Sequence, residues 1–219
     1  MRSIFSIILI CFSFNIISIA QNQVDYTGAT TIKRIVEVID VEVNPNFYLN
    51  ARTNPFNKII YELATSTYQG EKITAYRDSS CKEQITADEI LLKGRSEETI
   101  TIYPDPDDPE LQLDTTLIDL FRASSIVRYI IKMDSLILPD NLSAYKIIAI
   151  APLYSVTMVG VLLKEPPLFW VKWEDLEELL KTIPFAGPLN VNGKMTYYDF
   201  FVNHMFSGSS DLEDIEMTD

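Results

Sequence analysis

Cysteine, histidine and glycine are scarce in this sequence, and each shortage argues against a class of protein. Its 219 residues contain 2 cysteines, 1 histidine and 7 glycines. Cys11 lies in an apolar N-terminal stretch, so a chain that loses this stretch keeps only Cys81 and can form no internal disulfide. One histidine and one cysteine cannot supply the usual zinc ligands, and there is no glycine-rich loop to bind a phosphate. We therefore expect no cofactor and no His/Cys metal site, while a site built only from carboxylates stays open.

Basic residues are also few. The chain has 18 Lys and Arg against 31 Asp and Glu, which gives a formal net charge of −13 at pH 7. A chain this acidic repels phosphate backbones, so we expect no nucleic-acid partner. Apolar residues make up 47% and charged residues 22% of the sequence, a balance typical of folded rather than disordered chains.

The first 20 residues predict a cleavable secretory signal peptide. Arg2 supplies the positive start, Ile4–Phe14 is the apolar stretch, and Ser18-Ile19-Ala20 ends in the small residues that a signal peptidase reads. The apolar stretch is shorter than the roughly 20 residues of a membrane-spanning helix. Ile10 precedes Cys11 where a lipid-attachment site needs a small residue, so we expect no lipid anchor. Retention of this segment as an N-terminal anchor is the alternative, and we expect no other membrane span.

Strand and helix patterns alternate over residues 32–94. Apolar and acidic side chains alternate up to Val43, which predicts a strand. Two helices follow, the first opened by Asn54-Pro55 and the second by the capping box Thr86-x-x-Glu89. The apolar face of the first helix is expected to hold Phe56, Ile59, Ile60, Leu63 and Thr67. The predicted elements are a strand at 32–43, a helix from Asn54 to Gly70, a short strand at 73–76 and a helix from Thr86 to Gly94.

Residues 95–122 predict an exposed acidic linker. Ser96 to Asp114 carries seven acids and three prolines, and only Thr99–Tyr103 is expected to be extended. A calcium loop needs spaced oxygen ligands and a turn glycine. The cluster around Asp105–Asp108 has neither, so a solvated acidic loop is the favoured interpretation.

Residues 123–208 contain mainly strand patterns, followed by two helices. The segment 127–134 alternates as a half-buried strand does, whereas 144–151 is apolar on both faces as a central strand would be. Both helices have clear starts, because acids follow Trp173 and Thr196-x-x-Asp199 is a capping box. The predicted elements are strands at 127–134, 144–151, 159–163 and 168–172, a helix from Trp173 to Pro184, and a helix from Thr196 to Gly208.

These patterns predict an α+β fold, in which amphipathic helices pack on a mixed or antiparallel sheet. Ile85–Leu91 and Met195–Phe201 share the order apolar residue, Thr cap, acid and apolar pair. Two interpretations stay open: a duplicated strand-helix-helix unit, or capping boxes that recur by chemistry alone. The predicted organisation is a signal peptide (1–20), a flexible lead-in (21–31), an N-terminal half (32–94), an acidic linker (95–122), a C-terminal half (123–208) and an acidic disordered tail (209–219).

Aromatic residues gather near the C-terminus, where nine lie between Phe169 and Phe206. The last helix is apolar almost all round, so it must be buried on more than one side. It lies either within the core of its own domain or against a partner, because aromatic side chains are enriched at interface centres. The candidate partner interface is Phe169, Trp170, Trp173, Tyr197, Tyr198 and Phe201.

Catalytic patterns are weak. His204 lies among aromatic residues, so we expect a packed or surface histidine rather than a base. Ser143-x-x-Lys146 matches the pattern of penicillin-binding enzymes, but residues three apart on the strand predicted there face opposite sides. The acids Glu174–Glu178 suit a helix N-terminus. We predict that the protein is not an enzyme.

Several short segments carry a family resemblance through their order and spacing. They are Val36–Asp40, Asn57–Gly70, Ile73–Tyr76, Val127–Asp134, Tyr145–Pro152, Leu168–Val171 with Asp175 and Leu180, and Met195–Phe201 leading to Met205-Phe206-Ser207. Together, over residues 34 to 207, they resemble the GldN/PorN family of Bacteroidetes gliding-motility and type IX secretion proteins. Two positions depart from the family pattern: Glu177 stands where an arginine is expected, and Ser135-Leu136 replaces an aromatic pair.

The resemblance implies a non-enzymatic structural subunit of the type IX secretion and gliding machinery. Such a subunit lies in the periplasm, is held at the outer membrane by a partner, and forms a ring by self-association and by binding an outer-membrane lipoprotein of the GldK/PorK type. From the residues, one alternative is a periplasmic or secreted module that binds a peptide or glycan through Trp170, Trp173 and Tyr197. Another is an enzyme that uses unpaired carboxylates.

Overall fold

The computed structural model describes residues 27–41, 49, 56–102, 113–119, 121–139, 142–158 and 161–209. Several predictions fall outside these residues: the signal peptide, most of the lead-in, the Asn54-Pro55 cap, the Asp105–Asp108 loop and the tail after Ser209. The elements are β1 (Thr30–Asp40), α1 (Phe56–Thr65), α2 (Ala87–Lys93), β2 (Ser96–Ile102), β3 (Leu113–Asp119), the 3-10 turn η2 (Ala123–Ser125), β4 (Arg128–Ile137), β5 (Ser143–Leu153), β6 (Val156–Met158), β7 (Val161–Lys164), β8 (Val171–Lys172), α3 (Trp173–Leu180) and α4 (Tyr197–Val202).

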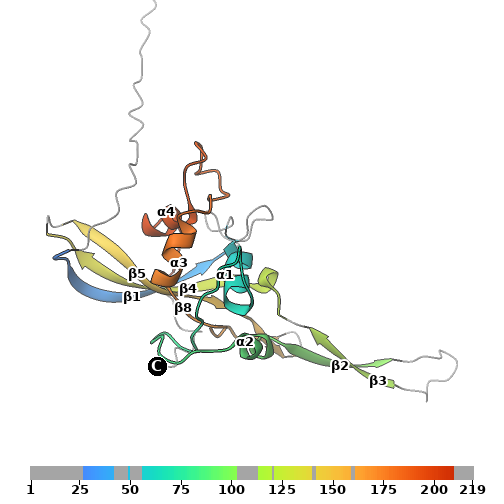
Figure 1. Ribbon diagram of the computed structural model, residues 1–219. Coiled ribbons are helices and arrows are strands. Elements are labelled where there is room, and N and C mark those ends of the chain that lie inside the picture. The colour runs from blue at the N-terminus through green and yellow to red at the C-terminus, as the bar shows by residue number, and fades with distance from the viewer. Residues whose placement is uncertain are drawn as a thin grey trace, which may run out of the picture.

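The centre of the molecule is a curved four-stranded sheet in the order β1-β4-β5-β8, with antiparallel neighbours throughout (Figure 1). This confirms the α+β class and decides between the two predicted kinds of sheet in favour of the antiparallel one. The central position predicted for 144–151 is also confirmed, since β5 lies between β4 and β8. The half-buried pattern predicted for β4 is wrong at Ile130, which is fully buried like its neighbours Tyr129 and Ile131.

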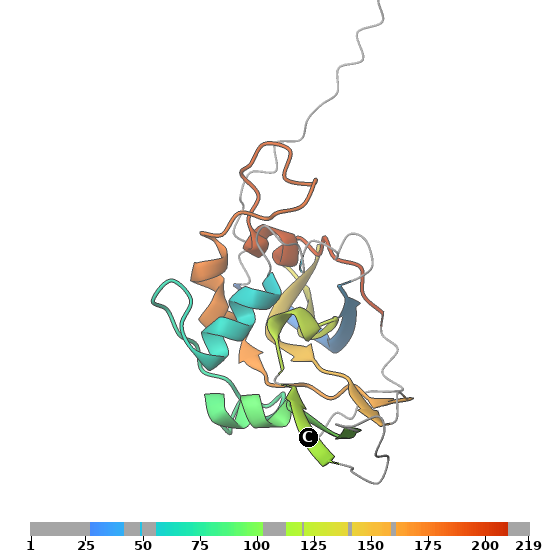
Figure 2. The same ribbon diagram turned by 90° about the vertical axis from the view of Figure 1, so that its right-hand side faces the viewer.

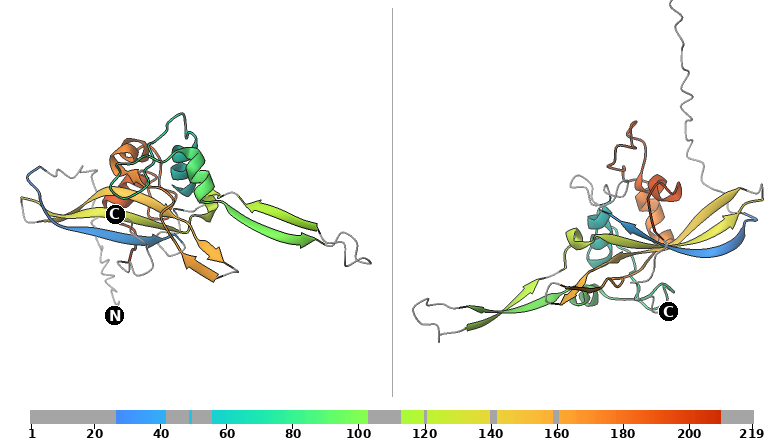
Figure 3. Two further views of the ribbon diagram at one scale, coloured as in Figure 1. Left: turned by 90° about the horizontal axis from the view of Figure 1, so that it is seen from below. Right: turned by 180° about the vertical axis from the view of Figure 1, so that it is seen from behind.

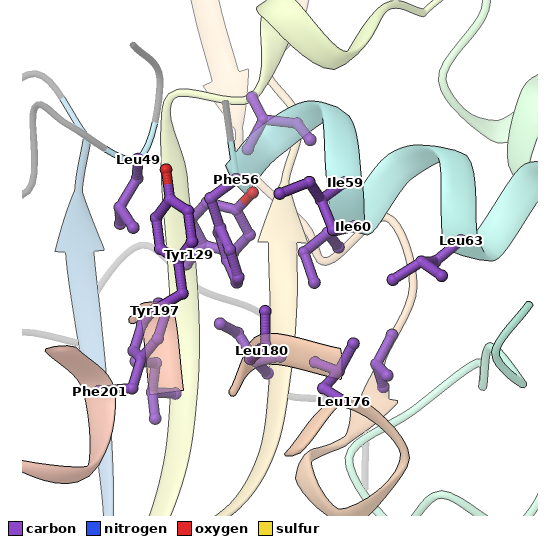
Figure 4. Close-up of a cluster of buried hydrophobic side chains, with 14 of the residues drawn as sticks. Leu49, Phe56, Ile59, Ile60, Leu63, Tyr129, Leu176, Leu180, Tyr197 and Phe201 are labelled. Atoms are coloured by element: carbon purple, nitrogen blue, oxygen red, sulfur yellow. The ribbon is translucent and has the colours of Figure 1, made fainter. Parts of the chain in front are cut away.

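One face of the sheet carries the main core. Helices α1, α3 and α4 lie on this side (Figures 1 and 2). The predicted apolar face of α1 is confirmed for Phe56, Ile59, Ile60 and Leu63, which are all buried against the sheet and the other helices (Figure 4). Burial of each such side chain stabilises the fold by about 1.5–3 kcal/mol. The core therefore joins residues of both predicted halves.

The opposite face of the sheet carries a smaller apolar cluster. Its members are Val38, Tyr76, Ile130, Ala149, Ala151, Leu153 and Trp170. The backbones of Tyr76 and Trp170 donate to each other over 2.8 Å in both directions, which holds the segment after α1 across this face. Because the centre of the sheet is covered on both sides, β4 and β5 are apolar on both faces.

Several predicted boundaries are wrong. Helix α3 ends at Leu180 and not at Pro184, and only Val171–Lys172 of the strand predicted at 168–172 is formed. Thr67, predicted on the apolar face of the first helix, lies beyond α1 and is exposed. Residues 73–76 form no strand, because only Tyr76 bridges to other chain segments. Helix α1 ends at Thr65 and not at Gly70, whose φ of +88° instead serves a tight turn between Tyr68 and Glu71. Helix α4 ends at Val202 and not at Gly208.

The end of α4 is a Schellman motif. His204 takes the left-handed position with φ of +50° and donates its N–H to the carbonyl of Phe201 over 3.0 Å. The N–H of Met205 reaches the carbonyl of Phe200, also at 3.0 Å. This pair of bonds satisfies carbonyls that the helix leaves open and turns the chain back toward β1.

The acidic segment between the halves forms a β-hairpin arm. Its strands β2 and β3 pair from Ser96↔Asp119 to Ile102↔Leu113, whereas the sequence predicted only one short extended piece within a linker. The arm projects from one side of the body. The end of the main sheet where β1 begins and β4 ends projects from the opposite side (Figure 3). Strand β1 from the N-terminal half pairs with β4 from the C-terminal half, so the two halves share one sheet. A duplication of strand-helix-helix units stays a prediction.

Candidate interaction surfaces

The predicted aromatic interface is mostly part of the core. Five of its six residues are buried, and only Tyr198 is partly exposed. The ring of Phe56 from α1 lies 5.4 Å from Tyr197 and 5.0 Å from Phe201 (Figure 4). The ring of Trp173 lies 5.5 Å from that of Phe201 in an edge-to-face arrangement. Such ring pairs contribute about 0.5–1.5 kcal/mol beyond the area that they bury. In the folded chain these rings hold α1, α3 and α4 together.

The six aromatic residues also do not share one surface. Phe169, Trp173, Tyr197 and Phe201 belong to the main core, whereas Trp170 points to the smaller cluster on the other face of the sheet. The alternating directions of neighbouring side chains in extended backbone cause this separation. The hypothesis of a peptide or glycan site required open rings at Trp170, Trp173 and Tyr197, and all three are buried. Contact between Tyr198 and a partner stays a prediction.

A buried polar pair joins α1 to the sheet. The hydroxyl of Tyr129 donates to Oδ1 of Asn57 over 2.7 Å, and Nδ2 of Asn57 donates to the carbonyl of Ile126 over 2.8 Å. Burial raises the pKa of Tyr129 well above its ordinary value, so the hydroxyl stays protonated. Both groups are therefore neutral and satisfied, which makes this a structural pair. Sequence analysis missed Asn57, although a polar residue beside the apolar face of α1 was a visible signal.

The acids at the start of α3 form local ion pairs. Nζ of Lys181 lies 3.1 Å from Glu177 and 2.7 Å from Glu178, and Nζ of Lys172 lies 3.5 Å from Glu174. Burial, and then the charge of Glu174, raises the pKa of Asp175. Within the described part of the chain, no three His, Cys, Asp or Glu side chains group as metal ligands. The arrangement fits the predicted helix N-terminus with a charged face.

The structure describes both residue patterns that were considered for catalysis, Ser143-x-x-Lys146 and His204. Ser143 and Lys146 both lie in β5, as predicted, where residues three apart face opposite sides. His204 is partly exposed, and its Nε2 lies 3.5 Å from Oε2 of Glu37 on β1. Its ring also lies 4.9 Å from that of Tyr145, so the predicted packed or surface role is confirmed. This contact holds the segment after α4 beside β1, where Val38 and Ser209 exchange two backbone hydrogen bonds of 2.9 Å.

The β2–β3 arm exposes large apolar side chains that sequence analysis missed. Ile102 is 42% exposed, and Leu113 and Ile118 are each 54% exposed. Ile102 pairs directly with Leu113, so the two side chains share one face of the hairpin. On the other face, Oγ1 of Thr101 donates to Oδ1 of Asp114 over 2.9 Å. Ile118 lies on this second face, opposite Glu97, so only Ile102 and Leu113 form a pair of exposed apolar neighbours among the described residues of the arm.

The comparison with protein families gives a match over most of the chain. A family model described as "Gliding motility associated protein GldN" matches residues 24–210, a range that includes every described element. The description names an association with motility and no catalytic activity. No curated protein matches the chain. In the described residues, none of the helices has the length and apolar character needed to cross a membrane.

Proposed function

This chain belongs to the GldN family of gliding-motility-associated proteins, and we propose from this membership that it is a structural subunit of the type IX secretion and gliding machinery. In this proposal the mature chain lies in the periplasm. It forms a ring-like scaffold with copies of itself and with an outer-membrane lipoprotein of the GldK/PorK type, which supplies the attachment to the membrane. The family match over residues 24–210 is the observation that carries the proposal.

Features of the chain support export, a structural role and contact with more than one neighbour. The N-terminal pattern of Arg2, an apolar stretch and Ser18-Ile19-Ala20 supports export. The aromatic side chains are used in packing, and the acids of α3 are paired with lysines, which supports a structural role over a catalytic one. The main sheet and the β2–β3 arm extend in opposite directions, a shape that suits a subunit with more than one neighbour (Figure 1).

The test is the state of the protein in native envelopes. Envelopes are extracted in mild detergent and separated by size, and the chain is followed together with the outer-membrane lipoprotein. We expect both proteins in one high-mass complex. Recovery of the chain only as a free monomer would contradict the scaffold role.

A deletion strain tests the secretion role separately. We expect that loss of the chain stops export of cargo proteins to the medium and that the wild-type gene restores it. Unimpaired secretion in a strain without a second family member would contradict this part of the proposal.

A further inference from the structure

We propose that the β2–β3 arm is a docking element, and that its apolar face binds an apolar groove bordered by lysine and arginine side chains on a different protein. The first observation is that the arm is unsupported. Its two strands pair only with each other, and no other strand of the described chain extends them. A lone two-stranded hairpin is marginally stable in water. A partner that covers one of its faces would supply the missing layer.

The second observation is the division of the hairpin into two faces. The register places Ile100 opposite Thr115 and Ile102 opposite Leu113 on one face. On the other face Thr99 lies opposite Thr116, next to the hydrogen-bonded pair of Thr101 and Asp114. Two of the three exposed large apolar side chains of the arm, Ile102 and Leu113, are thus neighbours on one face, whereas Ile118 lies on the other face opposite Glu97. Neighbouring exposed apolar side chains on a protruding element are typical of an interaction site. The apolar face is therefore the one that enters the groove.

The third observation is the charge of the arm, which selects the kind of partner. The described strands β2 and β3 contain four Asp and Glu and no Lys or Arg. Opposite charge around an interface accelerates encounter and suppresses wrong partners. A second copy of this chain, with a net charge of −13, attracts an acidic arm less than a basic protein does, so the proposed occupant is a different protein with a basic surface. This proposal goes beyond the scaffold role, which can stand if the arm binds nothing.

Two double variants separate docking from hairpin stability. The first, Ile102→Asn with Leu113→Asn, makes the apolar face polar. The second, Thr99→Asn with Thr116→Asn, changes one directly opposed pair on the other face of the same hairpin and is the matched control. Asparagine adds no charge, so the attraction to a basic partner is unchanged. Circular dichroism checks that both variants melt with the wild-type body.

The binding experiment uses purified mature protein and envelopes from a strain that lacks the chain. Sedimentation measures the concentration at which half of the sites are filled. We expect the apolar-face variant to need at least about tenfold more protein and the control to stay within about twofold. We also expect wild-type binding to weaken as salt rises from about 0.05 M to about 0.5 M, because salt screens exposed charges. Equal binding by both variants, or binding that does not weaken with salt, would overturn the proposal.

A photo-crosslinking side chain at position 113 identifies the occupant in living cells. An adduct with a different protein, joined at a peptide flanked by lysine and arginine, supports the proposal. A dimer of this chain, or no adduct above that from the same crosslinker at exposed Val191, overturns it. If the apolar-face variant still enters the high-mass envelope complex, the arm proposal fails and the scaffold proposal stands.

Discussion

In the body of the molecule, the centres of β4 and β5 are covered on both faces, whereas β2 and β3 in the arm pair with no other strand in the described part of the chain. The two regions also differ in charge, since the arm concentrates acids and the body centre is apolar. A single chain thus contains one region that is stabilised by packing on both faces and one whose apolar side chains Ile102 and Leu113 stay exposed. The difference predicts that substitutions in the body affect folding, and that substitutions in the arm affect binding.

The largest expected effect is on the aromatic core. Phe56→Ala removes the ring that contacts Tyr129, Tyr197 and Phe201, and should lower the free energy of unfolding by about 3–5 kcal/mol. Leu113→Ala in the arm should change it by less than about 0.5 kcal/mol. Urea unfolding followed by tryptophan fluorescence measures both, because Trp170 and Trp173 are buried in the body. Similar losses for the two variants would refute the contrast between body and arm.

The buried polar pair should have the next largest effect. Tyr129→Phe leaves Oδ1 of Asn57 buried without its donor, which costs about 1–3 kcal/mol. Tyr61→Phe removes a bond from the Tyr61 hydroxyl to the carbonyl of Phe121 at a partly buried position, so a smaller loss of about 0.5–1.5 kcal/mol is expected. Urea unfolding measures the loss of unfolding free energy for each variant. A larger loss for Tyr61→Phe than for Tyr129→Phe would show that burial does not determine the cost of losing the hydrogen bond.

Sequence patterns predicted the body well because burial there follows local periodicity. The apolar face of α1, the central position of β5 and both capping boxes could be read from spacing alone. Alternation in the strand predicted at 168–172 would have placed Phe169 and Trp170 on opposite faces, but the aromatic residues were grouped by their density in the sequence alone. Sequence analysis therefore grouped six aromatic residues that the fold distributes over two clusters.

The arm was missed because its composition hid its pattern. Thr99-Ile100-Thr101-Ile102 alternates as a strand does, but the prolines and acids that follow are typical of loops. The partner strand, from Leu113 to Asp119, lies beyond this acidic stretch, which is longer than the loops of about two to five residues that join most hairpin strands. Pairing between strands this far apart is set by three-dimensional contact and not by the local sequence.

The two capping boxes allow a smaller comparison within the body. Thr196 and Thr86 make the same bonds, each accepting from the backbone N–H three residues later. Thr196 is buried at the start of α4, whereas Thr86 is exposed at the start of α2. Thr196→Ala should cost about 1–2 kcal/mol and Thr86→Ala about 0.5–1 kcal/mol in urea unfolding. Substitution by serine should restore most of the loss at both positions, and no restoration would exclude the side-chain cap as the cause.

The smallest expected effect is a pH dependence at the start of α2. The backbone N–H of Thr86, and then the ion pair with Arg77, lower the pKa of Glu89 to about 2 from an ordinary value of 4.5. A carboxyl with a lowered pKa in the folded state stabilises the fold above the unfolded value, and this contribution is lost as the pH falls from about 4.5 through about 2. The Tm of Glu89→Gln should therefore lie slightly below that of the wild type at pH 7, and the two should converge as the pH approaches 2. Glu71→Gln, which replaces an exposed acid in the Tyr68–Glu71 turn, is the control for loss of charge. A gap between Glu89→Gln and the wild type that stays constant with pH would show that solvent screens the Glu89 contacts at this exposed site.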